Sequence, residues 1–378
     1  MKKGIKMKIL HTADWHIGRE LKGYSLKDEQ EEAVEQIISI AKEENIDAMV
    51  IAGDMYDTTL PKEESVEELG RMLEKINVKN NIPILAIRGN HDSGIRLGNG
   101  SAWYKEKKYF IKTKYKDVYN SIELGDCQFF LLPYFELQQA RNYFKDNKLI
   151  TLNDIMEKTV TELKKQFKKN KRHILVGHFL ALGSQRSNSE IKLEVGGLNA
   201  VDTSLFSDFD YVALGHLHNP RAISNEKIKY SGSILKYSLS EINQDKGVWI
   251  IDTENMDIRF RKLNPSHKMV KLEGSVEELT SNRHGLGLSD LVAITITDKE
   301  IVPNVYKKLN EYYPRIIQLD RKYDMNEPDE EKLDLKQVKK DPMMILEDFF
   351  EEVANKKLND KQKELAKETL DQAYNQTK

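Results

Sequence analysis

Five short apolar runs in this 378-residue chain each end in an Asp, Asn or His residue, and that recurrence limits the folds open to it. A buried strand that ends in such a residue delivers a polar side chain to one edge of a sheet. In open α/β sheets, sites are built at that carboxyl edge. The five fragments are Asp14-Trp15-His16, Gly53-Asp54-Met55-Tyr56-Asp57, Gly89-Asn90-His91-Asp92, Gly177-His178 and Gly215-His216-Leu217-His218. Carboxylate, amide and imidazole groups without a thiolate predict a metal centre for Mn, Fe or Zn rather than for Mg.

In this order the fragments match the motifs D-x-H, G-D-x-x-D, G-N-H-D, G-H and G-H-x-H, so the chain resembles the calcineurin-like metallophosphoesterases over residues 7–250. The string Met7–Arg19 and the long C-terminal extension resemble, more narrowly, the SbcD-type nuclease subunits of that superfamily. The resemblance implies an α/β fold: a four-layer metallophosphoesterase sandwich, a small α/β capping domain and a C-terminal helical hairpin.

The same resemblance implies two divalent metal ions, with Mn²⁺ favoured, and assigns their ligands. Asp54 would bridge the ions, since a carboxylate has lone pairs for two cations. One ion would be held by Asp14, His16, Asp54 and His218, and the other by Asp54, Asn90, His178 and His216. In the family pattern His91 is no ligand but assists the leaving oxygen, and we expect Asp92 to hold its ring. Asp57 is expected to support a ligand.

Hydrophobic periodicity predicts the element order around these motifs. Helical spacing covers residues 28–44, 62–77 and 151–168, and strands are expected over 122–134, 228–235 and 247–252. We divide the chain into residues 1–265, a second α/β unit (266–323), a charged linker (324–341) and a helical segment (342–378). The resemblance implies that the first part is the nuclease domain and the second the capping domain. In the capping domain we expect strands over 268–272, 291–297 and 315–320, and helices over 276–280 and 302–313.

The composition limits which binding partners and which cellular compartment are expected. The chain has 59 basic and 61 acidic residues, a net charge of −2, so any contact with DNA must come from local patches. The single cysteine excludes a disulfide framework and favours a reducing cytoplasm. No run approaches the roughly 18–20 apolar residues of a membrane span, so no membrane partner is expected.

Four basic residues follow loops of the predicted metal site, where a DNA backbone must pass. These are Arg19, Lys22, Arg96 and Arg186. The stretch 104–116 interleaves lysines with aromatic residues. It fits either a DNA-binding segment or a solvated lysine-rich surface with its aromatic rings turned inward.

The leading functional prediction is the nuclease subunit of an SbcC–SbcD-type complex in DNA end processing, repair and recombination. The resemblance implies 3′–5′ exonuclease activity on double strands, endonuclease activity on single strands and hairpins, and a homodimer. It also implies an SbcC-type ABC ATPase as partner, and we expect the amphipathic segment 342–378 to dock on it. Two alternatives stay open: a phosphodiesterase or phosphoprotein phosphatase with the same motifs, and an inactive scaffold that binds DNA ends.

Overall fold

The computed structural model describes residues 5–185, 200–281 and 284–322, together with scattered positions from 343 to 367. The chain divides into two compact units, residues 1–322 and 323–378. The architecture below is that of the first unit. The domain boundary expected at residue 265 stays a prediction, because this unit runs through it.

A six-stranded sheet carries the first three motifs. Its strand order is β15-β14-β1-β4-β5-β6. Strands β1, β4, β5 and β6 run parallel, whereas β14 pairs antiparallel with β1 and β15 pairs antiparallel with β14. The bounds are β1 Lys8–Thr12, β4 Ala48–Ile51, β5 Ile84–Ile87, β6 Tyr109–Lys112, β14 Gly247–Asp252 and β15 Asp257–Lys262.

A five-stranded sheet carries the last two motifs, in the order β13-β12-β9-β8-β7. All of its strands are parallel to their neighbours except β7, which pairs antiparallel with β8. The bounds are β7 Ile122–Leu124, β8 Cys127–Leu131, β9 Arg172–His178, β12 Tyr211–Gly215 and β13 Ile228–Tyr230. Two short ribbons, β2 Glu20–Leu21 with β3 Tyr24–Ser25 and β10 Leu180–Ala181 with β11 Ala200–Val201, lie outside the two sheets.

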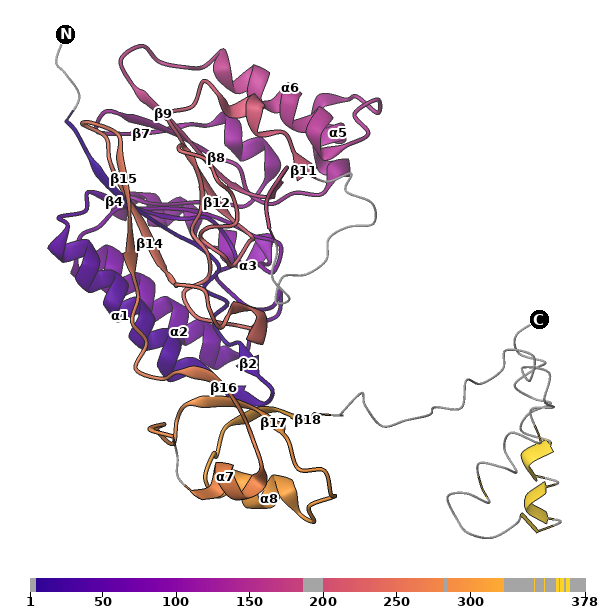
Figure 1. Cartoon of the computed structure of the whole chain (residues 1–378). Coiled ribbons are helices and arrows are strands. Elements are labelled where there is room, and N and C mark those ends of the chain that lie inside the picture. The colour runs from indigo at the N-terminus through magenta and orange to yellow at the C-terminus, as the bar shows by residue number, and fades with distance from the viewer. Residues whose placement is uncertain are drawn as a thin grey trace. The chain divides into compact units, whose positions relative to one another are not determined.

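The two sheets pack face to face and each is covered by helices on its outer side (Figure 1). The strand period of two sets this arrangement. Ile9 of β1 belongs to the core between the sheets, together with Phe129 of β8. Their neighbours turn outward: Leu10 packs in the core that includes α1 and α2, and Phe130 packs in the core that includes α6. The predicted four-layer α/β sandwich is confirmed.

The helices lie where the periodicity predicts them, with shorter ends. Helix α1 spans Lys27–Glu43, α2 spans Glu63–Glu74 and continues as a π-helical turn over Lys75–Lys79, and α6 spans Leu152–Lys164. In α2 the residues Glu68 and Met72 are buried, while Val66 is exposed. The shorter helices are α3 Gly94–Gly98, α4 Ser101–Tyr104 and α5 Leu137–Phe144.

A three-stranded parallel sheet follows, in the order β16-β17-β18. Its elements are β16 Met269–Gly274, α7 Val276–Ser281, β17 Leu291–Ile296, α8 Val305–Asn310 and β18 Ile316–Arg321, which confirms the five elements expected here. One face, with Leu291 and Ala293, packs into the core of α1 and α2, and the other, with Val292 and Ile294, packs with α7 and α8. No helix in the described part of the chain is long and apolar enough to span a membrane.

Candidate metal centre and its surroundings

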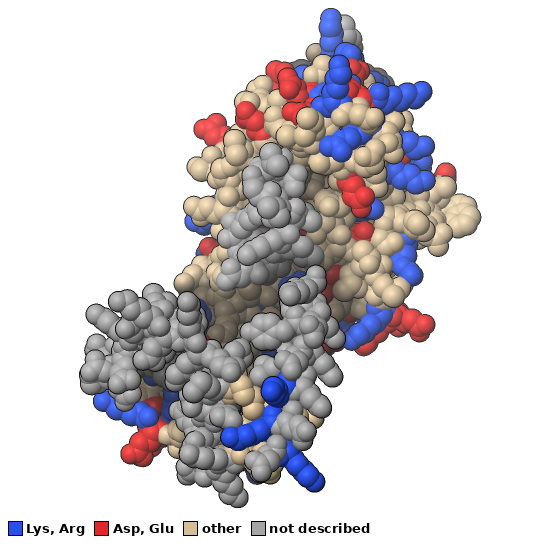
Figure 2. Space-filling model, turned by 90° about the vertical axis from the view of Figure 1, so that its right-hand side faces the viewer, with Lys and Arg blue, Asp and Glu red and all other residues tan. Residues whose placement is uncertain are grey.

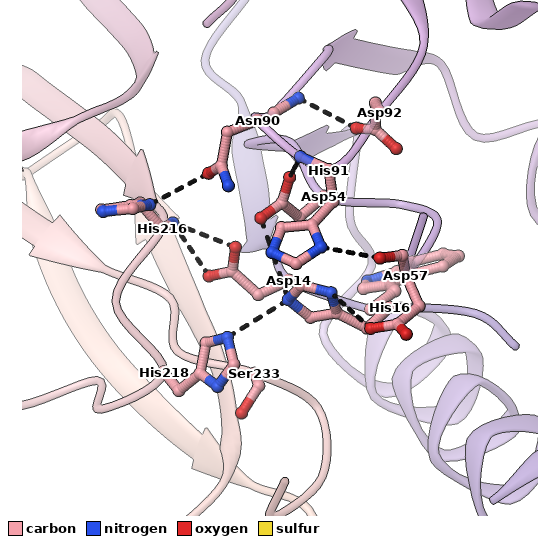
Figure 3. A network of polar contacts seen from close by, with 12 residues as sticks. Asp14, His16, Asp54, Asp57, Asn90, His91, Asp92, His216, His218 and Ser233 are labelled. Atoms are coloured by element: carbon pink, nitrogen blue, oxygen red, sulfur yellow. Dashed lines mark hydrogen bonds and ion pairs between the residues drawn. The ribbon is translucent and has the colours of Figure 1, made fainter. Parts of the chain in front are cut away.

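The motif residues meet at the carboxyl ends of five strands drawn from both large sheets. Asp14 and His16 follow β1, Asp54 follows β4, and Asn90 and His91 follow β5. From the second sheet, His178 closes β9, while His216 and His218 follow β12. Figure 3 shows the side chains that it labels, Asp14, His16, Asp54, Asn90, His91, His216 and His218, turned toward one another. His178 joins them through Asn90 and Asp54. The seven residues predicted as ligands are therefore brought together.

The backbone at four of these positions adopts left-handed conformations, which residues other than glycine rarely adopt. The φ angles are 53° at Asp14, 48° at His16, 50° at Asp54 and 94° at His216. Hydrogen bonds between loops fix the conformation, since Asp14 N donates to Gly53 O at 3.0 Å and His16 N donates to Asp54 O at 3.0 Å. Strain of this kind persists where surrounding structure over-determines it, and it concentrates at functional sites.

One half of the site gathers around Asn90. Its Oδ1 lies 2.9 Å from His178 Nε2 and 3.1 Å from His216 Nδ1. His178 Nε2 also lies 3.2 Å from Asp54 Oδ2. His178 Nδ1 donates to the carbonyl oxygen of Ala52 at 2.8 Å, so Nε2 is the nitrogen that faces Asp54 and Asn90 and that would bind a metal ion.

The other half gathers around His16. Its Nε2 lies 3.2 Å from His218 Nε2 and 3.8 Å from Asp54 Oδ2. Among the described residues, two groups of ligand atoms lie close enough to hold an ion, His16 with Asp54 and His91, and Asp14 with Asp54 and His178. Asp54 belongs to both groups. A carboxylate shared between two clusters is the arrangement that a bridging ligand requires.

The donor set and its surroundings fit metal ions. Asp14 and Asp54 are carboxylates almost fully buried from solvent, and such groups are paired or coordinate metals. A Cβ at Gly89 would lie 2.1 Å from Asp54 Oδ1, and one at Gly53 would lie 2.5 Å from His178 Nδ1. Both glycines therefore keep open the space in which the ligand atoms lie.

The charges of the buried groups agree with this fit. Burial disfavours charge on both Asp54 and His178, yet their attraction lowers the pKa of Asp54 and raises that of His178 to about 9. Burial lowers the pKa of His218 to about 4, so its imidazole is neutral, the form that binds metals. The site around Asp54 thus favours positive charge.

The contacts of His91 and Asp92 differ from the expectation. His91 Nδ1 lies 2.6 Å from the main-chain oxygen of Asp57, and His91 N donates to Asp54 Oδ1 at 2.8 Å. Asp92 accepts from the backbone amides of Gly89, Met55 and Tyr56 at 2.9, 3.2 and 2.9 Å. Asp92 therefore ties the loops after β4 and β5 together, and the carbonyl of Asp57, not the Asp92 carboxylate, orients the His91 ring.

Comparison with known proteins places this geometry in a family. Residues 7–220 match the calcineurin-like phosphoesterase family, and residues 265–354 match the type 5 capsule protein repressor C-terminal domain that is named for SbcD. The SbcD chain of the SbcCD nuclease from Staphylococcus epidermidis is 35% identical over 368 residues, covering 96% of this chain and 98% of that protein. The chain belongs to the SbcD family of calcineurin-like phosphoesterases. Because it belongs to this family, it is a metal-dependent phosphodiester hydrolase.

The solved structures that match 68% of this chain include two of low sequence identity. They are TT1561 of Thermus thermophilus, at 12% identity, full coverage of that chain and a TM-score of 0.42, and a dimetal phosphatase from Danio rerio, at 11%, 96% and 0.41. Neither similarity is high enough to inform the site of this SbcD-family chain.

A buried ion pair that the motifs did not reveal lies behind His218 in this SbcD-family chain. Glu241 Oε1 lies 3.5 Å from His218 Nδ1, and Glu241 Oε2 lies 2.5 Å from Lys246 Nζ. Lys246 Nζ also donates to the carbonyl oxygen of His218 at 2.7 Å and to Ser233 Oγ at 2.8 Å. Both charged residues are buried. The pair holds His218 from its ring and from its backbone, a role that no local pattern at Glu241 could signal.

The four basic residues that were predicted to contact DNA in this SbcD-family chain differ in their partners and their exposure. Arg19 Nη1 lies 2.8 Å from Asp57 Oδ1, and its guanidinium lies 5.1 Å from the ring centroid of Tyr237, so its charge is already paired. Its partner Asp57 also lies 3.4 Å from His16 Nδ1, which agrees with the supporting role expected of it. Lys22 and Arg96 are exposed, and Arg186 lies outside the described residues.

In the segment 104–116, the inward-facing interpretation holds for two of the rings. Tyr109 and Tyr115 are buried. On the face shown in Figure 2, the described Lys and Arg side chains are interspersed with Asp and Glu rather than gathered in one field.

Proposed function

We propose that this chain is the nuclease subunit of an SbcC–SbcD-type assembly and hydrolyses DNA phosphodiester bonds with two divalent metal ions. The observation that carries the proposal is the position of Asp54, which is common to both groups of ligand atoms. The ligand assignment of the sequence analysis, four residues for each ion with Asp54 between them, is part of the proposal. Mn²⁺ is the proposed metal, because imidazole, amide and carboxylate ligands suit it.

The bound ions would place positive charge on the phosphate oxygens and lower the pKa of a nearby water. His91 is half-buried beside this position, with its ring centroid 4.6 Å from that of His16. Because its Nδ1 faces the Asp57 carbonyl oxygen, that nitrogen keeps its proton and the ring keeps its orientation. Nε2 is then the nitrogen that can give a proton to the leaving oxygen. A group in this role contributes about 10²–10⁴-fold to the rate.

The proposed substrates are double-stranded DNA ends, cut 3′–5′, and single strands and hairpins, cut internally. The proposed partner is an SbcC-type ATPase, since the relative from Staphylococcus epidermidis is a subunit of SbcCD. The segment proposed to bind it, 342–378, lies mostly outside the described residues. The proposed compartment is the cytoplasm, where the single, buried Cys127 would stay reduced.

A homodimer is proposed as well. Three large apolar side chains, two of them on α3 and α4, face solvent: Leu60, Ile95 and Trp103 are 68%, 89% and 79% exposed. Apolar side chains that gather in one surface patch are typical of protein–protein contacts. We propose that these three contribute to the subunit contact.

A comparison of three substrates tests the proposed function. The purified chain with Mn²⁺ should nick supercoiled plasmid and degrade linear duplex DNA, and Asp54→Ala should abolish both activities. Hydrolysis of a phosphopeptide without any DNA cleavage would indicate a phosphatase. Hydrolysis of a chromogenic phosphodiester alone would indicate a small-molecule phosphodiesterase, and DNA binding without hydrolysis would indicate a scaffold.

A further inference from the structure

A cavity of about 1210 Å³ lies directly beside the metal centre. Its lining includes Asn90 and Asp92, residues 114–117 and Tyr143 of α5. Pockets for small ligands usually measure about 300–1,000 Å³. This cavity exceeds that range and touches a proposed metal ligand, so it suits an extended substrate whose reacting group lies at one end.

Arg88 lines this cavity, two residues before Asn90. Its Nε is buried and has no hydrogen-bond partner in the described part of the chain. Arg19, by contrast, is paired with Asp57. A guanidinium carries five N–H donors and is always charged, and leaving such donors unmet away from water costs free energy. Arg88 is therefore suited to meet an anion.

The guanidinium of Arg88 is held in place by the strand ends around it. Its Cζ lies 5.5 Å from the ring centroid of Tyr134, a cation–π contact. Tyr134 N donates to Arg88 O at 2.9 Å, which fixes the two residues side by side. Because the side chain is already ordered, little conformational entropy is lost when an anion binds.

The carboxylates that line the cavity do not neutralise Arg88. Asp92 accepts from three backbone amides, and Asp117 accepts from Lys114 N at 3.2 Å. Glu136 is exposed, and no ion pair joins it to Arg88 among the described residues. Two further polar residues of the lining, Gln139 and Asn142, can both donate and accept hydrogen bonds.

We propose that Arg88 binds a phosphate of single-stranded DNA next to the phosphodiester that is cleaved, and that the cavity holds the attached nucleotide. This proposal rests on the nuclease function proposed above and names a subsite of that function. A single strand fits because an unpaired base can stack on tyrosine and bond to amide side chains, and Tyr134, Tyr143, Gln139 and Asn142 line the cavity.

The first test measures binding without metals. Affinity for a fluorescein-labelled oligothymidylate in EDTA would be followed by anisotropy against salt concentration for the wild type, Arg88→Met and Arg88→Lys. Loss of one phosphate contact should reduce the log–log salt slope by about 0.7. We expect Arg88→Met to weaken binding about tenfold at low salt with that change in slope. Arg88→Lys should keep the slope but bind more weakly than the wild type, because it loses the guanidinium fork.

Arg71→Met is the matched control, because Arg71 is exposed on α2 and has no ion pair in the described structure. It should bind the oligonucleotide like the wild type. Wild-type affinity and slope in Arg88→Met would overturn the subsite, as would equal losses in Arg71→Met and Arg88→Met.

The second test separates the subsite from the metal centre. With Mn²⁺, Arg88→Met should hydrolyse bis(p-nitrophenyl) phosphate within about twofold of the wild type, because this substrate has no flanking phosphate, while its KM for single-stranded DNA rises about tenfold. Equal losses on both substrates, in a variant that melts like the wild type, would place Arg88 in the metal centre and overturn the subsite. If the wild type itself cleaves no DNA, the proposed nuclease function fails, whereas the EDTA measurement still decides whether Arg88 binds the strand.

Discussion

At the scale of single residues, the question most open to test is whether His91 is a metal ligand or the proton donor. His91 lies within 4.8 Å of ligand atoms of His16 and Asp54, so proximity alone does not separate the two roles. The contact of its Nδ1 with the Asp57 carbonyl does favour one of them. His91→Asn should keep both metal ions and lose about 10²–10⁴-fold in kcat. Metal content by mass spectrometry and the DNA cleavage rate would be measured on one sample, and loss of an ion would make His91 a ligand.

Glu241 gives a second prediction at this scale. Glu241→Gln removes the carboxylate charge that faces both Lys246 and His218 while conserving size. Changing such a supporting partner typically costs about 10–100-fold in metal affinity. We expect weaker Mn²⁺ binding by calorimetry, confined to the ion on the His16 side. Glu278→Gln, on the exposed face of α7, is the control. Unchanged affinity at both ions would show that the buried pair serves folding alone.

At the scale of elements, helix α2 contains an unusual buried carboxyl group. Glu68 is 2% exposed, its Oε1 has no hydrogen-bond partner in the described structure, and burial raises its pKa to about 7. Its folded pKa lies above the unfolded value, so the destabilisation begins as pH rises through about 4.5 and is complete above about 7. Glu68→Gln should therefore stabilise the protein by about 1–3 kcal/mol at pH 8 and by little at pH 4. Denaturant melts at both pH values measure this, and an equal effect at both would contradict it.

The elements also show what a sequence can and cannot predict. Helix α1 was predictable because Ala33, Ile37 and Ile38 recur at helical spacing and all three are buried. The edge strand β15 was not predicted, because four of its six residues are charged and none is fully buried.

The candidate site, too, could be predicted only in part from the sequence. Its motif residues could be identified because each closes a strand, whereas the partners of Arg19 and His91 lie 38 and 34 positions away and depend on how loops from different strands meet. The unpaired state of Arg88 could be seen only after folding, since it depends on which carboxylates lie nearby.

At the scale of the whole molecule, the chain combines a catalytic unit with a C-terminal segment proposed to bind a partner. The first unit, residues 1–322, contains the complete candidate metal centre. Deleting residues 342–378 should therefore leave Mn²⁺-dependent cleavage by the isolated chain largely intact and abolish co-purification with the ATPase. Within this segment Leu346, Phe349 and Val353 recur at helical spacing, which predicts one apolar face. Phe349→Asp alone should therefore weaken the complex by more than about 2 kcal/mol, the size of a buried hot spot. Co-purification that survives the deletion would place the contact elsewhere.

The central claim is that Asp54 bridges two metal ions in a DNA-cleaving site, and counting ions tests it most directly. Equilibrium dialysis against Mn²⁺, followed by elemental analysis, should give about two ions per wild-type chain. His178→Ala should lose mainly one ion, because His178 contributes to one half of the site, whereas Asp54→Ala should lose nearly both, together with plasmid nicking. Two ions and a near wild-type rate in Asp54→Ala would contradict the account.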